Sequence, residues 1–285
     1  MFQAIHDPRF IFSNNRTVDQ LPARPDGTSR IIVHHTAGGN NGNHLGTGSA
    51  ANLHNANRNG GGVGIPYNFY IESGAGTGSV DGRIVLGRGW NAQGAHTALP
   101  GGTNFNTHSL GIALQGNFHY APATRPTEAQ TRALVSLLGH IFAVWPSLRN
   151  VMGNHGGHRD MPGHSSNACP GQHFHGQVRH LLNCGRDFVS VVNALNTLRS
   201  RGIISDVNYW RDNFHLLEHL NTLIIRFGNT SVANAQVRNF TNARDAINHI
   251  ANRGIIDRPP THWLNNYSRV RFLNYFFIQF ANRIS

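Results

Sequence analysis

Short apolar segments separated by glycine- and asparagine-rich stretches make up the first part of the chain. The run 30–35 (RIIVHH) is apolar and β-branched, which predicts a buried strand. The stretches 67–73, 82–89 and 109–116 combine β-branched, aromatic and aliphatic residues between turn-forming ones, and they predict further strands. A shorter segment, 150–153, is expected to add another strand just before a histidine-rich loop.

Helical patterns occur at intervals between these strands. Residues 49–59 and 172–182 each predict a helix. The clearest helix is 128–145, with Thr127 as its N-cap and Pro146 as its stop. Strands that alternate with helices predict an α/β domain, here with a mixed central sheet flanked by helices. The strand order does not follow from the sequence.

The pattern changes near residue 185, after which glycine becomes rare and apolar residues recur at helical spacing. The segment 194–204 (ALNTLRSRGII) matches 246–256 (AINHIANRGII) at an offset of 52 residues. After a one-residue insertion the correspondence continues and pairs Trp210 with Trp263, Asn213 with Asn266, and 220–229 with 273–282. We therefore expect two domains: 1–185 with an irregular N-terminal lead-in, and 186–285 as a small all-α tandem repeat.

Two interpretations of the repeat domain stay open at this stage. In the first, the two copies form a targeting module with paired binding sites. In the second, the repeat is a duplicated helical bundle in which Trp210 and Trp263 are core anchors.

The charged residues narrow the function classes. All 24 basic residues are arginine, which excludes a lysine Schiff base, a P-loop lysine and a lysine general base. With 13 acidic residues the formal net charge is +11, which indicates an anionic partner such as nucleic acid, membrane or cell-wall polymer. The arginines form no cluster in the sequence, so specific nucleic-acid binding is not expected. No stretch reaches the ~20 apolar residues of a membrane span, and we find no classical signal peptide.

The segment 151–175 holds the strongest candidate chemistry, with five histidines and one cysteine. Zinc prefers imidazole and thiolate ligands, and a catalytic zinc site takes three from the protein and leaves a position for water. The segment supplies a histidine and Cys169, and we expect the third ligand from His34 or His35, only one of which can face the site. Three alternatives stay open here: a solvated histidine-rich loop, a structural Cys-Pro-Gly turn, and a Cys169–Cys184 disulfide.

Five motifs occur in a fixed order along the first domain. They are IIVHHTAGG, IPYNFYI, DGRIVLGRGWNAQGAHT, NTHSLGIALQGNF and GHRDMPGHSSNACPG. In this order they resemble the zinc-dependent N-acetylmuramoyl-L-alanine amidases, the type shared by phage amidase-lysozymes and peptidoglycan recognition proteins. The resemblance covers residues 28–182. It implies Zn²⁺ as cofactor and bacterial peptidoglycan as substrate.

The resemblance also implies roles for individual residues. The expected metal ligands are His34, His158 and Cys169. The loop between the last two is longer than in the phage enzymes, and His155 and His164 lie nearby as rivals of His158. The expected catalytic residues are Tyr67 and Asn167, and the expected substrate-binding residues are His35, His96 and Asn106.

Two positions depart from the family pattern. The strand 109–116 has Ala113 where some members have a glutamate, and Asn167 replaces a lysine of the phage-type enzymes. Asparagine can donate a hydrogen bond to an oxyanion but supplies no charge. More of the expected chemistry therefore falls on Tyr67.

Together these features predict a zinc hydrolase that cleaves the amide bond between N-acetylmuramic acid and L-alanine, as an endolysin or autolysin does. We expect it to be phage-encoded and released at lysis, or exported by a non-Sec route, with 186–285 binding an anionic wall polymer. One alternative is a non-catalytic peptidoglycan-recognition protein. Another is a nucleic-acid-binding protein with a structural zinc, whose fourth ligand would be His155 or His164.

Overall fold

A computed structural model gives the fold of the chain as two compact units, Met1–Arg186 and Asp187–Ser285. The structure describes residues 21, 23–24, 27–37, 49–60, 62–98, 104–119, 125–217, 220–229, 240, 242–256, 260–266, 273, 276 and 280. Most of the expected N-terminal lead-in, 1–20, lies outside these residues.

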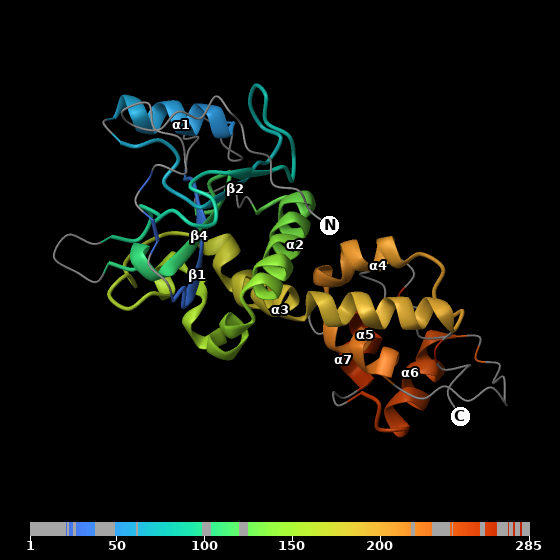
Figure 1. The fold of residues 1–285 in the computed structure, drawn as a ribbon. Coiled ribbons are helices and arrows are strands. Elements are labelled where there is room, and N and C mark those ends of the chain that lie inside the picture. Colours follow the sequence, from blue (N-terminus) through green and yellow to red (C-terminus); the bar gives the residue numbers. More distant parts are fainter. Residues whose placement is uncertain are drawn as a thin grey trace. The chain divides into compact units, whose positions relative to one another are not determined.

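The first unit is built on a five-stranded sheet with the order β3-β2-β4-β1-β5 (Figure 1). The strands are β1 (Arg30–His35), β2 (Phe69–Ile71), β3 (Ile84–Leu86), β4 (Ser109–Leu114) and β5 (Gly156–Gly157). Strands β2, β4, β1 and β5 run parallel, and β3 is antiparallel to β2. The sheet is therefore mixed, which confirms the expected α/β class.

Strand β1 lies in the interior of the sheet, with β4 on one side and β5 on the other. Its apolar residues Ile31, Ile32 and Val33 are fully buried, as their unbroken apolar run predicted. In the parallel register, His34 pairs with Ala113 of β4. The sheet therefore places the end of β1 in the middle of the domain.

Helices accompany this sheet. They are α1 (Ala50–Asn59), α2 (Glu128–Val144) and α3 (Gln172–Ser200). Thr127 and Gln130 form a capping box at the start of α2, as the N-cap prediction required. The Gln130 side chain also donates to the carbonyls of Ile71 and Gln115, so α2 is tied to the ends of β2 and β4.

Two predicted elements differ from the structure. Residues 150–153 are not a strand, because Pro146 begins a 3₁₀ helix over Pro146–Asn154, and the strand follows as β5. The helix predicted at 172–182 continues to Ser200, since Gly185 does not interrupt it. Gly185 fits there because a Cβ would lie 2.3 Å from Leu138 of α2. Among the described residues no single helix could cross a membrane, although the bent pair 128–144 and 146–154 passes by length and composition alone.

The second unit is helical, in agreement with the expected all-α repeat. Beyond the end of α3, its helices are α4 (Val207–Asn213), α5 (Leu220–Asn229), α6 (Ala243–Asn252) and α7 (Pro260–Asn266). Asn213 donates to the Tyr209 carbonyl at 2.6 Å, and Asn266 donates to the His262 carbonyl at the same distance. The copies thus share a local hydrogen bond as well as a sequence pattern.

The repeated tryptophans are packing residues. Trp210 is 4% exposed and Trp263 is 3% exposed. The Trp210 ring lies 4.8 Å from that of Phe276. Such burial leaves no indole face for a ligand, so the structure favours the interpretation of these residues as core anchors.

Candidate metal centre

Three side chains from distant parts of the chain meet at the end of the sheet. His34 lies near the end of β1, His158 directly follows β5, and Cys169 stands in the loop before α3. One donor atom from each lies within 4.8 Å of the other two. The structure therefore brings together the three predicted metal ligands, one of them buried and two partly buried.

The geometry of this group fits zinc. The His34 Nδ1 atom lies 3.5 Å from the Cys169 Sγ atom. Tetrahedral Zn–N and Zn–S bonds of about 2.1 and about 2.3 Å would separate such atoms by about 3.6 Å. Two imidazoles and one thiolate are also a donor set that zinc prefers. The residues present are thus suited to a zinc ion.

A second histidine stands behind His34. The His96 Nδ1 atom lies 2.9 Å from the His34 Nε2 atom, which leaves the His34 Nδ1 atom directed at the group. Gly111 of β4 makes room for this ring, because a Cβ there would lie 2.5 Å from His96 Cδ2. Metal-bound histidines commonly use their other ring nitrogen in this way.

Asn106 holds the segment that carries His96. Its Oδ1 atom accepts hydrogen bonds from the backbone N–H groups of His96, at 2.7 Å, and Thr97, at 2.8 Å. Both His96 and Asn106 are buried and bonded to protein groups. Substrate contact by these two residues stays a prediction. In the structure, His96 contacts His34 and Asn106 holds the His96 backbone.

Tyr67 stands beside the candidate ligands. Its ring centroid lies 5.1 Å from that of His34. Burial raises the pKa of the Tyr67 phenol, and the nearby Cys169 thiolate would raise it further. The phenol therefore stays protonated at neutral pH and is a hydrogen-bond donor.

His35 and Asn167 support the cysteine and its surroundings. The His35 backbone N–H donates to Cys169 Sγ at 3.3 Å, while the His35 ring accepts from the Phe118 N–H at 3.1 Å. The Asn167 Oδ1 atom accepts from the Cys169 N–H at 2.9 Å, which shapes the turn before the thiol. The roles predicted for His35 in substrate binding and for Asn167 in catalysis stay predictions.

Burial sets the protonation of the metal-free group. It raises the pKa of the Cys169 thiol to about 12, so the thiol is protonated at neutral pH. It lowers the pKa of His34, which His96 and His158 lower further, and burial together with His164 lowers that of His158 to about 4. The imidazoles are therefore neutral and have a free lone pair, whereas the thiol must lose a proton to bind a metal.

The structure distinguishes the alternatives that the sequence left open. His155, the rival of His158, uses both ring nitrogens elsewhere: Nδ1 accepts from the Ile31 N–H and Nε2 bonds the Leu148 carbonyl. Cys169 and Cys184 are both free thiols, so the disulfide does not form.

Sequence patterns alone missed two contributions to the site. His164 appears only as a rival ligand in the motif, yet its Nδ1 atom lies 3.0 Å from His158 Nε2. Gly111 looks like an ordinary strand glycine, yet it admits the His96 ring. Histidines at unusual density in the loop were the one available signal for His164.

The family model for N-acetylmuramoyl-L-alanine amidase matches residues 24–172, which is more than half of the chain. Peptidoglycan-recognition protein SC2 of Drosophila melanogaster is 31% identical over 161 residues, covering 54% of this chain and 74% of the relative. Peptidoglycan-recognition protein SC1a of the same organism is 29% identical over 124 residues, covering 40% of this chain and 51% of the relative. The chain therefore belongs to the N-acetylmuramoyl-L-alanine amidase family, as the five motifs indicated.

Two solved structures illustrate the similarity of the fold. The N-acetylmuramoyl-L-alanine amidase LysC from Clostridium intestinale is 22% identical with a TM-score of 0.43, covering 61% of this chain and 92% of that one. Wild-type Drosophila PGRP-LB is 20% identical with a TM-score of 0.44, covering 61% and 91%. At these values the family assignment rests on the sequence matches.

Proposed function

We propose that this protein is a zinc-dependent amidase that hydrolyses the bond between N-acetylmuramic acid and L-alanine in bacterial peptidoglycan. The observation that carries the proposal is the complete donor set His34, His158 and Cys169, whose donor atoms converge within 4.8 Å beside the Tyr67 ring. A protein that only recognises peptidoglycan has no need of a cysteine thiol at this place. The family membership supplies the substrate class.

Each residue of the site has a part in this reaction. His34, His158 and Cys169 would hold the zinc ion, which when bound lowers the pKa of water and polarises a carbonyl. The protonated Tyr67 phenol donates a hydrogen bond to the oxygen of the scissile carbonyl as negative charge develops on it. Asn167 keeps its amide N–H groups for the same oxygen, since its Oδ1 atom is used by the Cys169 N–H.

Two cysteine variants test the proposal with a matched control. Cys169→Ala is incubated with purified muropeptides beside Cys184→Ala, which removes the other free thiol, a buried one on α3. We expect wild type and Cys184→Ala to release L-alanine amino groups and to lose this activity with a chelator. Cys169→Ala should show no release above background. Release that ignores both the chelator and Cys169→Ala would refute the zinc mechanism.

The alternative of peptidoglycan recognition without cleavage is suggested by the names of the relatives. It predicts that wild-type protein retains muropeptide in an equilibrium binding assay but releases no amine at any zinc concentration. The same samples therefore decide between the two functions.

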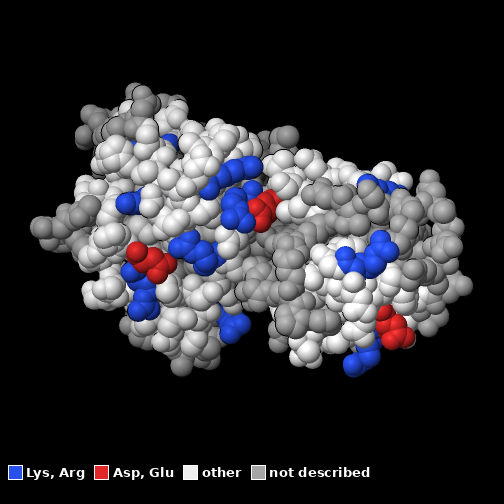
Figure 2. Space-filling view, turned by 90° about the horizontal axis from the view of Figure 1, so that it is seen from below, with Lys and Arg blue, Asp and Glu red and all other residues white. Residues whose placement is uncertain are grey.

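We further propose that the second unit binds an anionic cell-wall polymer. Residues 187–285 contain 11 arginines and six acidic residues. Figure 2 shows basic side chains in separate places on the visible face of the molecule. The excess of positive charge suits adhesion to an anionic polymer. A cavity of about 430 Å³ in this unit offers one contact place, lined by Val192, Asn196, Arg199, Ser205, Asp206, Val207, Asn208 and Arg211.

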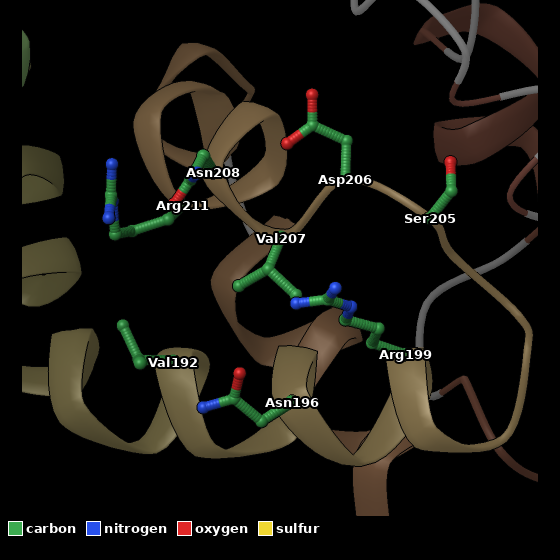
Figure 3. A pocket seen from close by; sticks show the side chains of 8 residues that line it. All are labelled: Val192, Asn196, Arg199, Ser205, Asp206, Val207, Asn208 and Arg211. Carbon is green, nitrogen blue, oxygen red and sulfur yellow. The ribbon is translucent and has the colours of Figure 1, made fainter.

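Arg199 is the residue of this cavity best placed to meet an anion. It is exposed on α3, and in Figure 3 its side chain extends along the cavity toward Val207. Arg211 by contrast is paired with Asp212 at 2.7 Å. The equivalent of Arg199 in the second copy is Ala251, so the feature belongs to one copy only.

Binding of the full chain to isolated sacculi tests this second proposal. Arg199→Ala should release the protein at lower salt than wild type, because an ionic contact is lost. Arg244→Ala, which removes an equal charge from an exposed position on α6 outside the cavity, is the control and should lower the releasing salt concentration less. Equal effects of the two variants would exclude a specific role for the cavity.

A further inference from the structure

Each of the two candidate histidine ligands is backed by another histidine. His34 Nε2 meets His96 Nδ1 at 2.9 Å, and His158 Nε2 meets His164 Nδ1 at 3.0 Å. The rings of the second pair are 4.9 Å apart between centroids. In both pairs the contact occupies Nε2 of the ligand and leaves its Nδ1 atom for the metal.

His164 is held firmly in this position. It is 1% exposed, and its ring lies 5.8 Å from that of Phe105. Its backbone N–H donates to the Met161 carbonyl, and its own carbonyl accepts from the Asn167 N–H, each at 2.9 Å. The longer loop between His158 and Cys169 therefore has a defined fold that points this imidazole at a ligand.

The hydrogen-bond pattern determines the tautomers of the pair. If His158 presents its Nδ1 lone pair to a metal, its Nε2 atom carries the proton and donates it to His164 Nδ1. A neutral His164 then carries its own proton on Nε2. That atom is buried and has no partner among the described residues. Burying an unpaired donor costs free energy, so packing alone would be better served by an apolar side chain here.

Carboxylates are common outer partners of metal-bound histidines, but the nearest one in sequence is engaged elsewhere. Asp160 accepts from the Gly157 N–H at 2.8 Å and contacts His175 Nε2 at 2.6 Å. Ala113, paired with His34 in the sheet, brings no carboxylate either. The imidazole of His164 therefore takes the place that a carboxylate would otherwise have beside His158.

We propose that His164 is a positioning residue of the metal centre, which accepts the Nε2 proton of His158 and thereby directs the His158 Nδ1 lone pair at the zinc ion. The inference rests on the proposed metal centre. Because histidines stand behind both ligands in place of carboxylates, the only negative charge among the three ligands would be the Cys169 thiolate.

Zinc affinity of the purified full-length protein, measured without substrate by competition with a chromophoric chelator, tests this inference. His164→Leu should lower the affinity by about 10–100-fold, the range found when an outer partner of a ligand is lost. His164→Asn should retain the affinity, because an asparagine Oδ1 atom can accept a proton near the place of Nδ1. The visible spectrum of the cobalt-substituted protein should change in the leucine variant and not in the asparagine variant.

A control separates positioning from folding. His155→Gln alters another buried histidine of the same region, which bonds only backbone groups. It should lower the free energy of unfolding and leave zinc affinity unchanged. Urea unfolding of the metal-free variants shows whether His164→Leu is folded. If it is not, the zinc affinity of His164→Asn still tests the inference.

Several results would overturn the inference. One is wild-type zinc affinity in folded His164→Leu, and another is an equal loss in the leucine and asparagine variants. Failure of the wild type to bind zinc would overturn it together with the metal centre. Loss of zinc affinity on His164→Leu, rescued by asparagine, in a protein that cleaves no muropeptide would support the inference and refute the proposed function alone.

Discussion

The two units of this protein bury different kinds of side chain. In the first unit the described interior includes polar groups such as His34, His96, Asn106 and Glu72, most of them joined by hydrogen bonds. In the second unit His215 is the one buried polar residue among those that the structure describes. Burying polar groups costs free energy unless each is paired. The first unit therefore needs hydrogen-bond partners for its buried polar groups, whereas the described interior of the second unit is almost entirely apolar.

The repeat explains the simplicity of the second interior. Helices α4 and α7 have the same length and correspond residue by residue at an offset of 53. Each copy turns through a glycine with a φ of 67°, Gly202 in one and Gly254 in the other. The copies share a pattern of buried apolar residues, although the exposed Arg199 of one corresponds to Ala251 of the other.

The largest expected effect concerns the core of the second unit. Trp210→Ala should lower the free energy of unfolding by about 3–5 kcal/mol, because a large buried ring leaves a cavity. Leu216→Ala, at a residue 38% exposed, should have a much smaller effect. Urea unfolding measures both. The metal centre lies in the first unit, so zinc affinity should be the same in both variants and in wild type.

A smaller effect is expected at Tyr67, in the first unit. Tyr67→Phe should lower kcat by about 10²–10³-fold, as loss of one oxyanion donor does. Zinc affinity should stay the same, because the phenol is not a ligand. Steady-state cleavage of muropeptide and chelator competition provide the two measurements. A tyrosine that serves only for packing would leave kcat unchanged.

Acid should lower the free energy of unfolding of the metal-free first unit between about pH 6.5 and about pH 4. Burial lowers the pKa of His96 to about 3 and those of His35 and His158 to about 4, whereas the unfolded chain binds these protons near 6.5. Below pH 6.5 the unfolded state therefore holds more protons, and stability falls as the pH drops toward 4. Each such group contributes about 1.4 kcal/mol per pH unit within this range.

Tryptophan fluorescence can follow the two units separately during urea unfolding of metal-free protein. Trp90 and Trp145 report on the first unit, and Trp210 and Trp263 on the second, in paired Trp→Phe variants. When the pH is lowered from about 6.5 to about 4.5, the urea midpoint of the first unit should decrease more than that of the second. Equal shifts in both units would contradict the assignment of the titrating groups to the first interior.

Much of the first unit could be predicted from local patterns. The apolar run of β1, the capped helix α2 and the motif residues His34 and Cys169 each have a signal within a few neighbours in the sequence. The 3₁₀ helix at Pro146–Asn154 was predicted wrongly, because two apolar residues carry too little pattern to distinguish it from a strand. The length of α3 was missed because helical pattern continued across a change in composition.

The sequence by itself determined the residue types, the repeat, the family and the absence of lysine chemistry. Only the tertiary structure decided which histidine joins the metal group, since His155 and His158 are three residues apart and have the same chemistry. It placed both nitrogens of His155 against backbone groups and left one nitrogen of His158 free, with His164 behind the other. Hydrogen-bond partners of this kind come from strands and loops far apart in the chain, and no local pattern records which of them meet.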